Sequence, residues 1–115
     1  MIILPIKKKW YDMILSGEKK EEYREISNYY YSRFKNVLGF NEMNKVLHSV
    51  SEYKSNVFDV VFRNGYRSNS PHIWAEVRLL VGTGKMKWGA EKDKVYYILE
   101  ILRIKPTIGG INLES

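Results

Sequence analysis

The alternation of hydrophobic and polar residues predicts short strands and helices along most of the chain. Residues 2–6 form a short apolar run, which indicates a first strand, and residues 7–16 have helical spacing. Gly17 follows where a helix end favours the left-handed backbone conformation that glycine adopts easily. Apolar residues recur at helical intervals over 28–38, and residues 39–56 indicate a helix fragment and a loop. The first half therefore supplies a strand and two or three helices besides one charged segment.

The second half of the chain is rich in predicted strands. Residues 57–63 alternate between apolar and polar positions, and the dipeptide Asn64-Gly65 is typical of a turn. A clean apolar side runs over 73–81, a basic loop occupies 85–94, and residues 95–104 are apolar on both sides apart from two charges. The whole pattern indicates an α+β fold of about five strands with two or three helices. Such short strands close more easily into a small, partly open β-barrel than into a flat sheet.

Length and composition fit one small globular domain. We assign residues 1–106 of the 115 to this domain and 107–115 to a C-terminal tail. The absence of cysteine excludes disulfides and thiolate zinc sites, the two histidines lack metal-ligand spacing, and no cofactor fingerprint is present. No apolar run approaches the roughly 18 residues of a membrane span, and no secretory signal is present. We therefore expect a cytoplasmic protein without a membrane partner, metal or cofactor; protein partners and oligomeric state are left open.

The charge balance is basic. Nineteen lysines and arginines against thirteen acidic residues give a formal net charge of +6, which favours anionic partners and nucleic acid above all. Lys7, Lys8 and Lys9 fall in the first turn of the first predicted helix, where cations oppose the helix dipole. Either these lysines are simply solvated side chains, or their unfavourable position marks a functional site.

The charged segment over 19–26 is the most informative part of the sequence. Strand geometry places Glu22 and Arg24 on one side, about 7 Å apart, with Lys19 on the other. Such a strand either lies on a wet edge, where Glu22 forms an ordinary ion pair, or lines a polar cavity. Glu100 has apolar neighbours on a later predicted strand and also needs a partner, for which Arg24 is one candidate.

Gly17, Lys19, Glu22 and Arg24 reproduce the Gly-x-Lys-x-x-Glu-x-Arg signature of ASCH domains. ASCH domains belong to the PUA-like superfamily of small β-barrels, and this chain resembles them over most of its length except 40–56 and the tail. The resemblance implies that the motif lines a cleft between the barrel and the first helices, and that the ligand is RNA or a nucleoside, modified or not. In such a cleft a guanidinium can bind phosphate or a carbonyl edge, and a carboxylate can accept from an exocyclic amine.

Two further groups of residues fit a nucleic-acid ligand. Arg63, Asn64 and Tyr66 surround the predicted turn, where an aromatic ring can stack on a base and a guanidinium can bind phosphate. The alternative there is a β-turn with polar decoration. Trp88 stands between lysines in the basic loop, as either a base-stacking platform or a buried lid on the core. The predicted ligand-binding residues are Gly17, Lys19, Glu22, Arg24, Arg63, Asn64, Tyr66 and Trp88.

The alternative function is a small hydrolase that acts on an acylated nucleoside or on RNA. A bacterial branch of the ASCH family removes the acetyl group from acetylcytidine with a lysine, a threonine and a glutamate. Here the lysine matches Lys19, the threonine falls on Glu22, and only Glu91 can stand for the glutamate. A carboxylate cannot perform the acyl chemistry of a hydroxyl nucleophile. Lys19 and Glu22 are therefore catalytic residues only if the protein is an enzyme, which the sequence leaves open.

Overall fold

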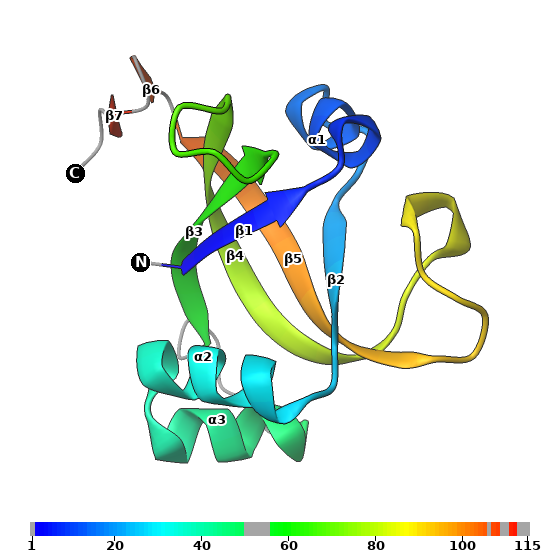
Figure 1. The fold of residues 1–115 in the computed structure, drawn as a ribbon. Coiled ribbons are helices and arrows are strands. Elements are labelled where there is room, and N and C mark those ends of the chain that lie inside the picture. The colour runs from blue at the N-terminus through cyan, green and yellow to red at the C-terminus, as the bar shows by residue number, and fades with distance from the viewer. Residues whose placement is uncertain (1, 50–55, 106, 109–110, 113–115) are drawn as a thin grey trace.

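A curled five-stranded sheet forms the body of the protein (Figure 1), as seen in a computed structural model that describes residues 2–49, 56–105, 107–108 and 111–112. The strands are β1 (Ile2–Ile6), β2 (Glu21–Glu25), β3 (Val57–Asn64), β4 (His72–Thr83) and β5 (Val95–Lys105). They lie in the order β1-β3-β4-β5-β2, with β1 parallel to β3 and the other neighbours antiparallel. The prediction of an α+β fold with a small, partly open barrel is confirmed.

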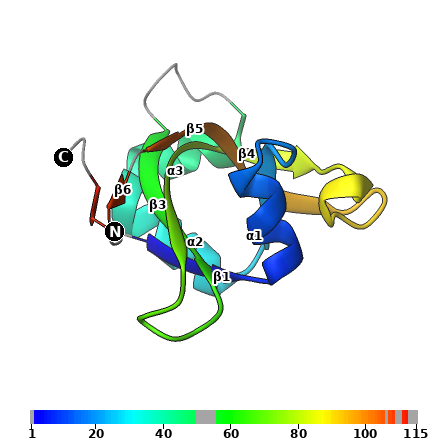
Figure 2. The same ribbon diagram turned by 90° about the horizontal axis from the view of Figure 1, so that it is seen from above.

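The helices cover the two ends of this curled sheet (Figure 1). They are α1 (Lys8–Leu15), α2 (Asn28–Leu38) and α3 (Phe40–Leu47), with a 3-10 turn, η1 (Met86–Trp88), in the basic loop. The pair α2 and α3 lies at one end of the sheet and α1 lies at the other. Seen from above (Figure 2), the strands curve around a common interior, and α1 stands at its rim. From α1 at this end of the sheet the chain continues directly into β2 (Figure 1).

Among the described residues, one hydrophobic cluster joins the sheet and the three helices. The predicted apolar side of β4 is buried at alternate positions, and the inner sides of β1, β3 and β5 meet it. The buried residues of this core are Ile2, Leu4, Ile6, Tyr11, Ile14, Phe34, Met43, Val46, Val60, Phe62, Ile73, Ala75, Val77, Leu79, Tyr97 and Leu99. From α2, Phe34 contacts the rings of Phe58 and Tyr97, with centroids 6.1 and 5.2 Å away. These contacts fix α2 against β3 and β5 close to the end of β2.

Some element limits differ from the predictions. The charged strand is confined to Glu21–Glu25, so Lys19 precedes it instead of belonging to it. The helix in the 39–56 region is α3, and residues 50–55 of that region lie outside the described part of the chain. The predicted tail includes two short paired strands, β6 (Thr107–Ile108) and β7 (Ile111–Asn112). Gly17 has φ +85°, as expected for a glycine just past a helix end.

The curled sheet has two edges, β1 and β2, which side chains bridge where no backbone ladder joins them. The Nη2 group of Arg24 on β2 donates to the carbonyl oxygen of Pro5 on β1 at 2.9 Å. From α2, Arg33 donates to the carbonyl oxygen of Ile3 at 3.4 Å. Proline has no N–H and is tolerated on such an edge. The sheet therefore stays open between β1 and β2, and the charged motif lies beside this opening.

Candidate functional site

The charged motif forms a buried ionic network rather than a wet strand edge. The carboxylate of Glu22 binds the ammonium of Lys19 at 3.2 Å through Oε1 and the guanidinium of Arg24 at 2.9 Å through Oε2. The side chains of Lys19, Glu22 and Arg24 are 1%, 9% and 15% exposed. Glu22 thus forms two ion pairs, but they lie in the interior and not on a wet edge, and an ion pair there needs good geometry and further hydrogen bonds to offset desolvation.

Lys19 reaches this network from outside the strand. Its backbone N–H donates to the carbonyl oxygen of Met13 in α1 at 2.9 Å, because the chain turns back at Gly17. The prediction that Lys19 points away from Glu22 is therefore wrong: strand alternation does not apply to a residue in the turn before the strand. Its ammonium also donates to the carbonyl oxygen of Trp88.

Aromatic rings surround the Lys19 ammonium. The ring centroids of Trp10 and Tyr23 lie 4.9 and 5.0 Å from its Nζ atom, a distance that permits cation–π attraction. Burial lowers the pKa of Lys19 from its usual value of 10.5, and the neighbouring Glu22 carboxylate partly opposes that shift. The lysine is thus held by a carboxylate, a backbone oxygen and two rings.

Arg24 connects the network to both edges of the sheet. Besides Glu22 and the carbonyl oxygen of Pro5, its guanidinium binds the hydroxyl oxygen of Tyr30 on α2 at 2.9 Å. Burial lowers the pKa of Arg24, but Glu22 and Tyr30 outweigh burial and leave that pKa raised. Its Nε atom is buried and has no hydrogen-bond partner among the described residues. One buried donor of Arg24 is therefore unsatisfied.

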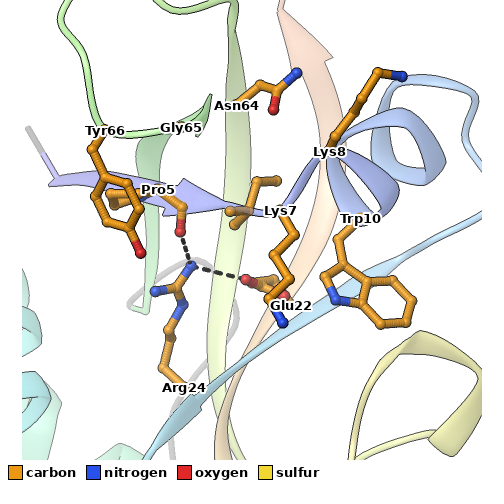
Figure 3. A pocket seen from close by; sticks show the side chains of 10 residues that line it. Pro5, Lys7, Lys8, Trp10, Glu22, Arg24, Asn64, Gly65 and Tyr66 are labelled. Atoms are coloured by element: carbon orange, nitrogen blue, oxygen red, sulfur yellow. Dashed lines mark hydrogen bonds and ion pairs between the residues drawn. The ribbon is translucent and has the colours of Figure 1, made fainter.

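The network opens onto a first cavity of about 480 Å³ (Figure 3), a volume within the range of small-molecule sites. Its lining residues are Pro5, Ile6, Lys7, Lys8, Trp10, Glu22, Arg24, Asn64, Gly65 and Tyr66. Figure 3 shows Glu22 and Arg24 together, with the rings of Trp10 and Tyr66 on either side of them. Tyr66 is 88% exposed, so its ring is accessible to a ligand.

A second cavity of about 500 Å³ adjoins the first one, and Lys7, Trp10 and Glu22 line both. The second cavity is also lined by Tyr23, Glu25, Trp88, Gly89, Glu91, Lys94 and Tyr96. The loop after β4 is joined to β2 beside this cavity, because the backbone N–H of Lys85 donates to the hydroxyl oxygen of Tyr23 at 2.9 Å. The Lys94 ammonium binds Glu25 at 2.8 Å, and this contact ties the far end of the loop to β2.

The predicted ligand-binding residues separate into two groups. Glu22, Arg24, Asn64 and Tyr66 line the first cavity, and Lys19 lies directly behind Glu22. The other three residues do not line the first cavity. Gly17 shapes the turn before β2, Arg63 lies on β3 with a buried Nε atom, and Trp88 lines the second cavity.

Of the two predicted alternatives for Trp88, the structure shows the buried one. It is 6% exposed, so its ring is not the free platform that stacking on a base requires. The neighbouring Gly89 brings the loop against α1, because a Cβ atom there would lie 3.0 Å from the ring of Trp10. Trp88 therefore acts as a lid, and its carbonyl oxygen holds Lys19 in place.

Glu100 does not bind Arg24. Its carboxylate lies 3.9 Å from Arg78 on β4, and Arg24 is instead occupied by Glu22, Pro5 and Tyr30. The candidate pairing of Glu100 with Arg24 is therefore wrong. Glu100 stands opposite Arg78 in the antiparallel register of β4 and β5, which explains their pairing.

Sequence reasoning missed several residues of the site. Trp10 is not among the predicted ligand-binding residues, yet it lines both cavities. Pro5 and Tyr30 supply the oxygen atoms that orient Arg24, and neither carries a local signal for that role. The lysines at the start of α1 carried a signal, the unfavourable charge at a helix N-terminus, and Lys7 and Lys8 do line the first cavity.

Comparisons with known proteins add no relative: no protein-family model, curated protein or solved structure matches this chain. Within the described ranges, no helix is both long and apolar enough to cross a membrane. The same ranges hold no group of three histidine or acidic side chains placed to bind a metal ion. The side chains that line the first cavity offer a carboxylate acceptor, cationic donors and aromatic faces.

Proposed function

We propose that this protein is an ASCH-type domain of the PUA-like kind that binds RNA or a nucleoside, modified or not, in the first cavity. The observation that carries the proposal is the buried network of Lys19, Glu22 and Arg24, which opens onto a cavity with aromatic walls. Maintaining three charges in the interior of a small domain costs desolvation energy, and replacing such charges with hydrophobic residues of similar volume often leaves the stability of a fold unchanged or raises it. A ligand that uses the carboxylate accounts for that cost.

The contacts available in the cavity match those that recognise an unstacked base. The ring of Tyr66 offers an exposed face for stacking, which contributes about 1–3 kcal/mol per base in single-stranded recognition. Each oxygen of Glu22 keeps acceptor capacity beyond its one cation, so the carboxylate can accept from an amine or ring N–H. Asn64 at the same wall adds an amide with donor and acceptor groups.

One observation favours the alternative, a hydrolase: burial lowers the pKa of Lys19, which is the direction needed for a lysine base or nucleophile. Two observations weigh against it. The Lys19 ammonium is held by Glu22 and by the carbonyl oxygen of Trp88, both of which favour its charged form. The hydrogen bonds and ion pairs of Lys19 and Glu22 within the described chain include no serine or threonine hydroxyl. We therefore place binding first.

A titration tests the proposal. Tryptophan fluorescence or calorimetry would report binding of cytidine, acetylcytidine and a short single-stranded RNA, and chromatography of the same samples would report turnover. Tyr66→Ala should weaken binding about 5- to 100-fold, as expected for the loss of one stacking contact. Tyr29→Ala is the matched control, because Tyr29 is also exposed, at 60%, but lies on α2 outside both cavities.

A second variant tests the carboxylate. Glu22→Gln should weaken binding of any ligand that uses the carboxylate as an acceptor, and its folded state is checked by circular dichroism at the temperature of the titration. Unchanged affinity in both Glu22→Gln and Tyr66→Ala refutes the proposal, as does absence of binding by all three probes. Turnover of acetylcytidine that Lys19→Met abolishes would establish the hydrolase instead.

A further inference from the structure

The first cavity carries more positive charge than its one carboxylate can balance. Lys7, Lys8 and Arg24 line it together with Glu22, and the buried Lys19 ammonium lies behind Glu22. Glu22 is already shared between Lys19 and Arg24. The two lysines at the start of α1 therefore have no counter-charge on the cavity wall.

The two lysines differ in how they are paired. The Lys8 ammonium binds Asp12 at 2.6 Å on the surface of α1, where both side chains are largely exposed. The Lys7 ammonium has neither a hydrogen bond nor an ion pair with any residue that the structure describes. Figure 3 shows Lys7 between the rings of Tyr66 and Trp10, with Lys8 further out. An unpaired cation thus stands in the cavity that holds the carboxylate and the exposed ring.

We propose that the site takes its ligand as a phosphate monoester: a nucleoside phosphate, either free or as the phosphorylated end of an RNA chain. This inference rests on the proposed function and adds the phosphate to it. The base lies against Tyr66 and reaches Glu22, and the phosphate binds the Lys7 ammonium, with Lys8 as a second donor. A phosphate monoester carries a charge between about −1.5 and −2 at neutral pH, which suits two ammonium groups. A neutral nucleoside leaves the Lys7 charge unmatched.

Arg24 cannot take the place of Lys7 in this scheme. A guanidinium binds phosphate best with two parallel N–H groups. In Arg24 the Nη groups already serve Glu22, Pro5 and Tyr30. Lysine binds phosphate as a flexible point charge and needs no such pairing of donors. The positive side chain free to follow a phosphate is therefore Lys7.

The test compares ligands that differ only in the phosphate. Calorimetry measures binding of the four common ribonucleosides, their 5′- and 3′-monophosphates, and inorganic phosphate. A short single-stranded RNA with either a hydroxyl or a phosphate at its 5′ end distinguishes a free nucleotide from an RNA end. The proteins are the wild type, Lys7→Met and the matched control Lys92→Met, whose lysine is exposed and lines neither cavity.

We expect at least one monophosphate to bind about tenfold more tightly than its nucleoside, the size of one hydrogen bond to a charged group. Lys7→Met should abolish that preference, so that it binds the nucleoside and its monophosphate with equal affinity, and Lys92→Met should preserve it. Equal affinities for nucleoside and monophosphate in the wild type overturn the inference alone, as does a preference that survives in Lys7→Met. Absence of binding by every probe overturns the inference together with the proposed function.

Discussion

Removing the charge of Glu22 is expected to destabilise the fold strongly. Its carboxylate lies between Lys19 and Arg24, at 3.2 and 2.9 Å, and its side chain is 9% exposed. Glu22→Gln preserves the shape of the side chain but leaves two buried cations without their counter-charge. Breaking a buried ion pair by removing one partner costs about 3–5 kcal/mol. For a domain of this size, a loss of about 3 kcal/mol lowers Tm by roughly 10 °C.

Two further variants set the scale for this loss. Lys19→Met removes one cation but leaves Glu22 paired with Arg24, so we expect a smaller loss, about 1–3 kcal/mol, for the donor that the carbonyl oxygen of Trp88 would lack. Glu25→Gln is the matched control on the same strand. The side chains of Lys94 and Glu25 are 37% and 58% exposed, so water and salt screen this pair and Tm should hardly change.

Thermal and urea denaturation, followed by circular dichroism at neutral pH, measure all three variants. The expected order of stability is wild type close to Glu25→Gln, then Lys19→Met, then Glu22→Gln. If Glu22→Gln is as stable as Glu25→Gln, the carboxylate does not hold the two cations in the interior. If Lys19→Met is less stable than Glu22→Gln, packing around the lysine stem contributes more to stability than the buried carboxylate charge does.

Two other perturbations test neighbouring parts of the site. Gly84→Ala should lower stability by about 1–3 kcal/mol, because the new Cβ atom would lie 2.5 Å from the ring of Tyr23. Gly82→Ala is the control, because its Cβ atom would lie 3.6 Å from the nearest atom and should leave stability unchanged. Thermal denaturation compares the two variants. Burial lowers the pKa of Lys19 below 10.5, so between the two values the unfolded chain keeps a proton that the folded chain has released. Between these two pKa values, the free energy of unfolding of the wild type should therefore rise with pH relative to that of Lys19→Met. Urea denaturation at several alkaline pH values measures both proteins, and a difference between them that does not change with pH would contradict this reasoning.

The sequence was sufficient for elements whose signal is local. The alternating apolar residues of β4 predict a strand with one buried side, since neighbours two residues apart decide that pattern. The apolar run of the first strand and the helical spacing over Asn28–Leu38 are also local signals, and they predict the observed limits of both elements. The side-chain alternation that puts Glu22 and Arg24 on one side of the charged strand is likewise local, and both line the first cavity.

The rest of the site depends on contacts between distant parts of the chain. Lys19 joins Glu22 only because its turn is folded back on α1, and its backbone acceptor at Trp88 comes 69 residues later. The burial of Trp88 depends on the path of the whole loop, which follows from Gly89 meeting the ring of Trp10. Periodicity contains no information on such distant pairings, so both alternatives for Trp88 agreed with the sequence.

Arg24 has two tasks, and together they restrict what a ligand can use. Its bond to the carbonyl oxygen of Pro5 bridges the open edges of the sheet, and its bond to Glu22 holds the carboxylate that faces the first cavity. A ligand that withdrew these Nη donors would weaken the closure of the barrel as it bound, which costs affinity. Ligand contacts that leave the closure intact are those to Glu22, Tyr66 and the lysines of α1. We therefore expect Arg24 to orient the proposed site, and the groups around it to make the contacts with a ligand.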